Sequence, residues 1–292
     1  MKTVLMNTNN MDQKIVTIIG IGLIGGSMAI ALKEKGISKK IFGIDSNKDH
    51  QEKALQLKLV DEIAELDEAI DNSDLIILSV PVDASEKLLP AILDRVGNQV
   101  VMDVSSTKNG IVAVVSDHPL RKRFVATHPM WGTEYSGPEA AVPGAFIDKA
   151  TIICNKQDSD ADAIQLVETI YKTLGMHILY MDAAAHDLHA AYVSHISHIT
   201  SFALANTVLE KEREEDAIFE MASAGFESTV RLAKSNPAMW VPIFMQNREN
   251  VLDVLNEHIS QLRKFKSCLE KENYEYLQEL IENANKIGRI IK

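Results

Sequence analysis

Cysteine is scarce in this sequence, and its scarcity excludes several kinds of site. The 292 residues include two cysteines, Cys154 and Cys268, which lie too far apart to match any metal-binding or redox motif. We therefore interpret both as packing residues of a protein that occupies a reducing compartment.

The sequence also lacks a long apolar run and an excess of positive charge. No stretch reaches the length needed to span a bilayer, and residues 1–13 are polar, without the apolar core of a signal peptide. We expect residues 1–13 to be a mobile leader and the protein to be cytoplasmic. Acidic residues outnumber basic ones by 41 to 30, and the net charge of −11 argues against nucleic acid or an anionic membrane as a partner. A local cationic pocket for an anionic small molecule is still compatible with this charge.

The first motif is a glycine-rich turn between an expected strand, Lys14–Ile19, and an expected helix. In a G-x-G-x-x-G turn the first glycine permits the tight turn, and the second lets the backbone approach a pyrophosphate. The third lets the helix pack on the strand, and the helix start offers unpaired N–H groups to the phosphates. In this context the motif predicts a dinucleotide site that includes Gly20, Gly22, Leu23, Ile24 and Gly25.

A carboxylate at the end of the second expected strand favours one dinucleotide. Asp45 lies 20 residues after Gly25, where such folds hold the hydroxyl groups of the adenosine ribose. A carboxylate there repels the 2′-phosphate of NADP, and the following Ser46 and Asn47 include no arginine to receive it, so we expect NAD as the cofactor. Lys48 is the one nearby cation. The alternative is that Asp45 only caps the next helix.

Polar residues follow two further apolar strands at the same edge of the expected sheet. The run Asp74–Pro81 ends in three residues that we add to the cofactor site: Ser79, Val80 and Pro81. The run Gln99–Val104 leads into Ser105, which we interpret as a helix cap. Ser106 is the better candidate for a polar contact with substrate or nicotinamide.

The segment Thr127–Glu134 combines a histidine, a tryptophan, a hydroxyl and a carboxylate. It follows an expected strand over Arg121–Ala126, and its proline and glycine exclude a regular helix, so we predict a shaped loop. Such loops at strand ends are where α/β enzymes keep their chemistry. Taken alone, the segment is equally compatible with a surface turn that carries a solvated His128.

Strands and helices alternate as far as Met181, and only helical patterns follow. We predict an α/β protein with an N-terminal extended Rossmann domain over residues 14–181 and an all-helical substrate and dimerisation domain over residues 182–292. Its first helix is expected from Asp182 to about Leu209 and its last from Ser260 to Ile291. The number of apolar helix faces predicts an intertwined homodimer.

Four histidines occur in the first of these helices. At about 100° per residue, His195 lies opposite His186 and His198 lies opposite His189, so one helix cannot turn all four to one ion and we predict no metal site. His195 and His198 either offer polar groups to one cleft or are packed, hydrogen-bonded histidines.

Farther on, Arg231 is a two-pronged donor suited to a carboxylate, unless it forms a surface ion pair.

Together these motifs resemble the prephenate dehydrogenases of tyrosine biosynthesis over about residues 14–265. Besides the glycine-rich turn, the resemblance rests on Asp103–Lys108, His128–Glu134, Ser136–Gly137, Ser194–His198, Phe226–Arg231 and Pro237–Trp240. It implies the NAD-dependent oxidation of prephenate at ring C4, with loss of the ring carboxylate as CO2, to give 4-hydroxyphenylpyruvate.

The resemblance also implies residue roles. It makes His128 the base that accepts the hydroxyl proton, with Ser106 sharing the hydrogen bonds of that hydroxyl. It makes Arg231 the anchor for a substrate carboxylate and Glu134 a member of a polar network that closes the pocket. Three further substrate contacts are implied: Thr133, His195 and His198.

Two positions depart from the family's pattern, and two other functions stay open. Ser228 stands where relatives carry an aspartate, and Trp131 where a small residue is common. Arogenate dehydrogenase shares the mechanism but takes an amine in place of the keto group. A catalytically silent, NAD-sensing Rossmann protein would be missing the base or the anion anchor, and both His128 and Arg231 are present.

The assignment of Asp45 predicts the effect of removing its carboxylate. Asp45→Ala is expected to relax the preference for NAD over NADP, because the group that repels the 2′-phosphate is lost. The ratio of kcat/KM values for the two cofactors measures this preference, and an unchanged ratio would refute the ribose contact.

Overall fold

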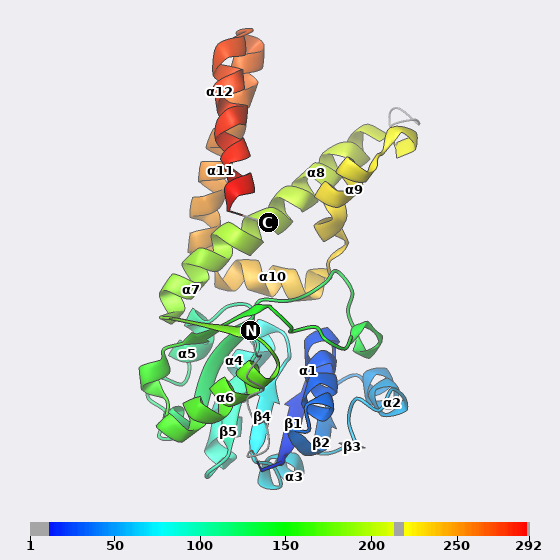
Figure 1. Cartoon of the computed structure of the whole chain (residues 1–292), viewed down its shortest axis with the longest axis vertical. Coiled ribbons are helices and arrows are strands. Elements are labelled where there is room, and N and C mark those ends of the chain that lie inside the picture. The colour runs from blue at the N-terminus through cyan, green and yellow to red at the C-terminus, as the bar shows by residue number, and fades with distance from the viewer. Residues whose placement is uncertain (1–11, 213–218, 291–292) are drawn as a thin grey trace, which may run out of the picture. The chain divides into compact units, whose positions relative to one another are not determined.

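The computed structural model describes residues 12–212 and 219–290, so most of the expected leader lies outside the described residues. The contacts divide the chain into two compact units, of which the first ends at Asn247 and the second is Arg248–Lys292 (Figure 1). Each unit is described by itself.

The first unit is built on an eight-stranded sheet with the order β3-β2-β1-β4-β5-β6-β7-β8. All its strand pairs are parallel except β6 with β7, which is antiparallel. The strands are β1 (Lys14–Ile19), β2 (Ser38–Ile44), β3 (Glu62–Ile63), β4 (Leu75–Leu78), β5 (Val100–Asp103), β6 (Phe124–Pro129), β7 (Ala150–Cys154) and β8 (His177–Met181). This sheet and the helices after it confirm the predicted fold class.

Helices cover both faces of the sheet (Figure 1). They are α1 (Leu23–Glu34), α2 (Lys48–Gln56), α3 (Leu66–Asp71), α4 (Val82–Arg95), α5 (Asn109–Ala113) and α6 (Ala161–Thr173). Side chains of α1 and α6 share one buried cluster, whereas those of α3, α4 and α5 share the other.

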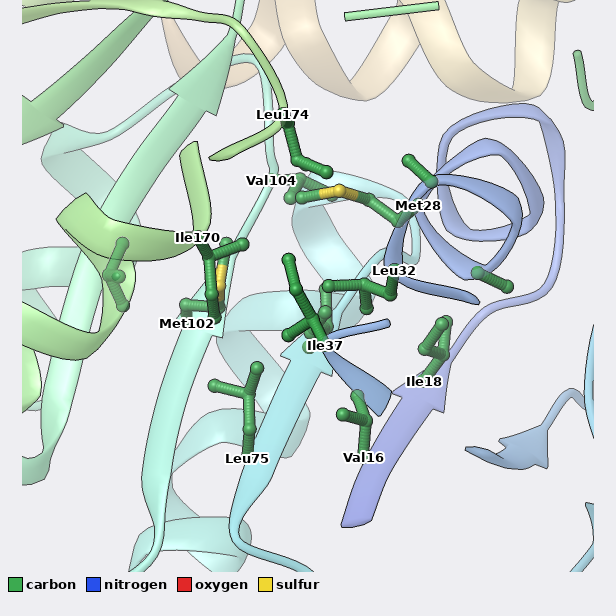
Figure 2. Close-up of a cluster of buried hydrophobic side chains, with 14 of the residues drawn as sticks. Val16, Ile18, Met28, Leu32, Ile37, Leu75, Met102, Val104, Ile170 and Leu174 are labelled. Carbon is green, nitrogen blue, oxygen red and sulfur yellow. The ribbon is translucent and has the colours of Figure 1, made fainter. Parts of the chain in front are cut away.

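The strand β4 shows why the sheet is buried on both faces. Alternate side chains of a strand point to opposite faces, so Leu75 and Ile77 enter the first cluster while Ile76 and Leu78 enter the second. Figure 2 shows Leu75 in the first cluster, which also contains Met28 and Leu32 of α1. Each fully buried side chain of this kind stabilises the fold by about 1.5–3 kcal/mol.

The strand that carries the histidine segment differs from its prediction. A 3-10 turn occupies Arg121–Arg123, and β6 then continues to Pro129, so His128 is a strand residue that pairs with Ile152 of β7. The predicted loop therefore begins at Met130. Strand backbone holds His128 more firmly than a loop would.

Helices alone follow β8 among the described residues. The expected long helix consists of α7 (Ala183–Ala190), a π-helical turn (Ala191–His195) and α8 (Ile196–Glu212). A π turn adds a residue to one turn and so changes which side chains share a face. The first unit ends with α9 (Ala224–Val230), a 3-10 turn (Arg231–Lys234) and α10 (Pro237–Gln246).

The second unit is a pair of helices, α11 (Arg248–Glu270) and α12 (Tyr274–Asn285), followed by a 3-10 turn. The prediction of one last helix from Ser260 to Ile291 was wrong. Glu272 has a φ of 52° and ends α11, and the side chain of Asn273 accepts a hydrogen bond from the backbone N–H of Tyr276 to begin α12.

The glycine-rich turn gives a prediction about stability. A Cβ atom at Gly25 would lie 2.0 Å from the carbonyl oxygen of Gly20, whereas a Cβ atom at Gly22 would meet nothing within 4 Å. Gly25→Ala is therefore expected to lower the free energy of unfolding by about 1–3 kcal/mol, as overpacking does. The matched variant Gly22→Ala should unfold like the wild type in a urea titration. Equal stability of the two variants would contradict the steric argument.

Candidate active site

A cavity of about 930 Å³ lies at the carboxyl ends of β1, β2, β4 and β5. It is lined by eight of the predicted cofactor residues, namely Gly20, Gly22, Leu23, Ile24, Asp45, Ser79, Val80 and Pro81. The ninth, Gly25, is buried beneath the turn, as its packing role requires. Ser106 and Glu134 line the same cavity, which therefore joins the dinucleotide residues to one predicted catalytic residue and one predicted substrate residue. The other predicted catalytic and substrate residues are not among its lining: His128, Thr133, His195, His198 and Arg231.

The carboxylate of Asp45 is fixed by the glycine-rich turn. Its Oδ2 accepts a hydrogen bond from the backbone N–H of Ile21 at 3.0 Å, and its Oδ1 accepts one from the backbone N–H of Asn47 at 2.9 Å. The cap of α2 is the side chain of Asn47, so the alternative that Asp45 itself caps this helix does not hold. Each carboxylate oxygen can accept a second hydrogen bond, which suits a ribose hydroxyl.

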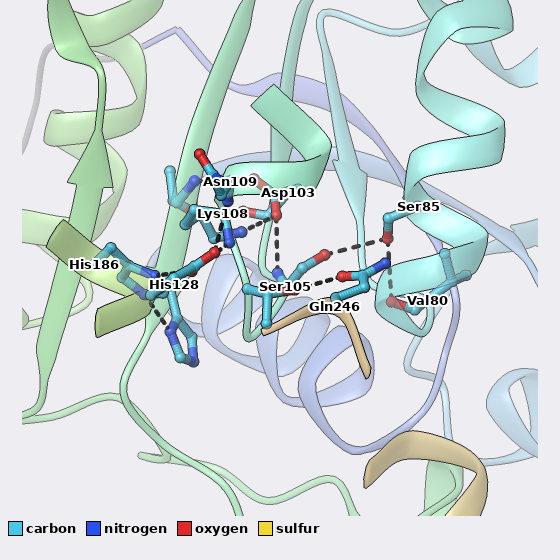
Figure 3. A network of polar contacts seen from close by, with 12 residues as sticks. Val80, Ser85, Asp103, Ser105, Lys108, Asn109, His128, His186 and Gln246 are labelled. Carbon is cyan, nitrogen blue, oxygen red and sulfur yellow. Dashed lines mark hydrogen bonds and ion pairs between the residues drawn. The ribbon is translucent and has the colours of Figure 1, made fainter. Parts of the chain in front are cut away.

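His128 begins a chain of buried hydrogen bonds that the sequence did not reveal (Figure 3). Its Nδ1 lies 2.8 Å from Nε2 of His186, and Nδ1 of His186 lies 2.8 Å from Oδ1 of Asp187. The two oxygens of Asp187 also accept the backbone N–H groups of Lys108 at 2.7 Å and Asn109 at 2.8 Å. This carboxylate therefore caps α5 and holds His186 at the same time.

The chain fixes the tautomer of each histidine. A carboxylate accepts hydrogen bonds, so Nδ1 of His186 donates to Asp187, and in a neutral imidazole Nε2 is then the acceptor. His128 then donates through Nδ1. Its Nε2 is left without a proton and can accept one.

Electrostatics also keep His128 neutral. Burial, together with the neighbouring His186 and Lys108, holds the pKa of His128 well below its usual value. A neutral imidazole whose Nε2 can accept a proton is the form that a general base requires.

His195 and His198 both pack against Trp240, at ring-centroid distances of 6.0 and 3.4 Å. The side-chain amide of Asn247 lies 3.1 Å from Nδ1 of His195, and Nδ1 of His198 donates to the carbonyl oxygen of Ser194 at 3.1 Å. Burial lowers the pKa of His195 to about 4 and also lowers the pKa of His198. Both are thus packed, hydrogen-bonded and neutral at pH 7.

Arg231 and Glu134 form an ion pair in which Nη1 lies 2.9 Å from Oε2. The Arg231 side chain is 50% exposed and that of Glu134 is 13% exposed. A hydrogen bond from its own backbone and the contact with Arg231 lower the pKa of Glu134, which is therefore ionised at neutral pH. The predicted carboxylate anchor and the predicted gate residue are thus direct partners.

Of the two serines after β5, Ser106 lies at the predicted sheet edge, whereas the prediction that Ser105 caps a helix was wrong. Ser106 is half-buried at the cavity. Ser105 is buried and its hydroxyl donates to Ser85, so it is no helix cap, and Asp187 takes that role instead. Thr133 does not line the cavity, and its hydroxyl accepts the backbone N–H of Tyr135 at 3.3 Å.

Trp131 has a structural role. Its ring packs edge-on against Phe146, with ring centroids 5.7 Å apart, and it contacts the first buried cluster. It therefore anchors the loop that carries Glu134 to the core.

Within residues 12–212 and 219–290, no group of three or more histidine, cysteine, aspartate or glutamate side chains is arranged to hold a metal ion. In the same part of the chain, no helix is long and apolar enough to cross a membrane. The two cysteines are buried and free.

The cavity at the glycine-rich turn suits a dinucleotide, and β6 of the same sheet carries a neutral histidine. Together these features are those of a Rossmann-type dehydrogenase. Family models give the particular family: that of the prephenate dehydrogenase nucleotide-binding domain matches residues 28–180, and that of the prephenate dehydrogenase dimerization domain matches residues 182–283. The chain belongs to the prephenate dehydrogenase family.

Individual relatives agree with this assignment. The chain is 30% identical to prephenate dehydrogenase of Bacillus subtilis over 94% of this chain and 75% of the relative. It is 29% identical to cyclohexadienyl dehydrogenase of Zymomonas mobilis over 96% of both. The solved structure of prephenate dehydrogenase from Aquifex aeolicus in complex with hydroxyphenyl propionate and NAD+ superimposes with a TM-score of 0.88, at 31% identity, over 97% of this chain and 99% of that one.

The hydrogen bonds of Asp187 predict the effect of Asp187→Asn. The new amide would turn an NH2 group toward an N–H donor and would no longer fix His186, so turnover should fall by roughly 10²- to 10⁴-fold, as for loss of an acid–base group. Steady-state kinetics measure the loss. Asp182→Asn is the matched control on the same helix, because Asp182 is the N-cap of α7 and asparagine caps equally well. Equal turnover of the two variants would remove Asp187 from the mechanism.

Proposed function

We propose that this chain catalyses the NAD-dependent oxidative decarboxylation of prephenate to 4-hydroxyphenylpyruvate. The observation that carries the proposal is the hydrogen-bond chain from His128 through His186 to Asp187, in which a neutral His186 leaves Nε2 of His128 without a proton. Membership of the prephenate dehydrogenase family supplies the substrate class.

The proposed reaction balances without an external acid. Nε2 of His128 accepts the proton of the C4 hydroxyl. NAD, held at the glycine-rich turn and Asp45, would supply the acceptor for the hydride that leaves C4. The ring carboxylate leaves as CO2, and its bonding electrons enter the ring, which becomes aromatic. The phenolate oxygen then takes the proton back from His128. While the proton resides on His128, the negative charge of Asp187 stabilises the cation through His186.

The ion pair at the rim suits the dianionic substrate. We propose that a substrate carboxylate replaces Glu134 at Arg231, whose planar guanidinium binds carboxylates in a bidentate manner. Glu134, once released, closes the cavity through other polar contacts. Ser106 and His128 both hydrogen-bond the substrate hydroxyl. His195 and His198 contribute further hydrogen bonds to the substrate. Thr133 does the same when its loop closes.

The proposal extends to organisation and location. Residues 14–181 form the NAD-binding domain, and residues 182–292 form the domain that completes the substrate site and makes a homodimer. The two family matches, which meet between residues 180 and 182, support this division. We propose the cytoplasm as the compartment, in keeping with the two free cysteines.

An assay of NADH formation tests the function and distinguishes it from arogenate oxidation. Prephenate and arogenate are offered in parallel, and the higher kcat/KM is expected with prephenate and NAD. His128→Asn should lower turnover by roughly 10²- to 10⁴-fold, as for loss of a general base, while NAD still binds. A near-wild-type rate would remove His128 from the mechanism, and no turnover of either substrate by the wild type would favour the NAD-sensing alternative.

A further inference from the structure

Lys108 is a fully buried cation close to the site. Its side chain and that of Asp103 are both 0% exposed, and the ammonium group forms an ion pair with Oδ2 of Asp103. Burying such a pair costs several kcal/mol for each ion before their attraction is counted, so stability alone is a weak reason for its presence.

The contacts of Lys108 reach, through Asp103, the residues that precede His128 and Ser106. Figure 3 shows Lys108 with Asp103 and Ser105. Asp103, the partner of its ammonium group, accepts the backbone N–H of Thr127 at 3.0 Å through Oδ1. Asp103 also accepts the backbone N–H of Ser105 at 3.0 Å through Oδ2. Thr127 directly precedes His128, and Ser105 directly precedes Ser106.

The main chain of Lys108 makes a third connection. Its N–H donates to Oδ1 of Asp187 at 2.7 Å, the same oxygen that accepts from His186. Lys108 therefore contacts β5 through its side chain, which pairs with Asp103. Its backbone N–H donates to Asp187, the carboxylate that orients the histidine chain.

We propose that Lys108 is a positioning residue that holds the Ser106 segment and the His128 strand in one arrangement and places a fixed positive charge on Asp103, next to the strand that carries the base. The inference rests on the proposed role of His128. That charge acts in the same direction as burial and His186, which together lower the pKa of His128. Other titratable groups near the base include Asp103 on β5, Tyr171 on α6, Cys154 on β7, Asp187 on α7 and His195 on the π turn.

The sign of the charge effect gives a measurable signature. A nearby cation disfavours imidazolium, so it extends the range in which His128 is neutral toward lower pH. Removing the cation should therefore move the acid limb of the kcat–pH profile to higher pH. Loss of packing alone would lower kcat without moving this limb.

Lys108→Met is the direct test, because methionine fills much of the same space without charge. We expect kcat at pH 7 to fall by roughly 10- to 100-fold, the scale of a small misplacement of catalytic groups, and the acid limb to move to higher pH. Lys122→Met, at an exposed lysine just before β6, is the matched control and should leave both unchanged. A lower kcat with an unmoved limb would make Lys108 merely structural and would overturn the inference.

A second variant covers the case in which Lys108→Met does not fold. Asp103→Asn removes the negative partner and leaves the ammonium group, so the acid limb should move to lower pH, opposite to the first variant. A limb that stays in place or moves to higher pH would overturn the inference. Failure of the proposed function is recognised separately, because the wild type would then form no NADH from prephenate or arogenate. Near-wild-type turnover of His128→Asn would instead remove the base on which the inference rests.

Discussion

The Asp187 carboxylate accepts hydrogen bonds from Lys108 and Asn109, which lie 79 and 78 residues earlier in the chain, and from the adjacent His186. These bonds satisfy the first N–H groups of α5 and orient the histidine chain with the same two oxygens. The start of the helical region is therefore fixed to the sheet edge where the cofactor cavity lies. Because a buried carboxylate without partners would be very unfavourable, the three donors and the fold depend on one another.

Much of the fold and the cofactor site could be predicted because both depend on local sequence. The alternation of strands and helices and the glycine-rich turn follow from patterns a few residues long. The position of Asp45 follows from its spacing after Gly25, and the structure adds only that its carboxylate is held by the turn. These features need no knowledge of which distant segments meet.

The histidine chain was missed because it is a tertiary arrangement. His186 could be considered only as a member of one regular helix, and the π turn at Ala191–His195 alters the faces on which that argument relied. The adjacent pair His186-Asp187 was a signal, since a histidine beside a carboxylate is a common orienting pair, but its partner His128 lies 58 residues away. Similarly, the asparagine cap at Asn273 was visible in the sequence and marks the break in the predicted last helix.

Charge is distributed so that an acidic protein can receive an anionic substrate. The chain carries a net charge of −11, and the histidines around Trp240 are neutral at pH 7 because burial lowers their pKa values. In the proposed mechanism, the half-exposed Arg231 attracts the anion by exchanging its partner Glu134, which lines the cavity, for a substrate carboxylate. The second cation, Lys108, is buried and already paired, so it cannot bind substrate. In the proposed mechanism Arg231 binds the anion, while Lys108 acts on the base through position and field, which separates recognition of the anion from control of the proton.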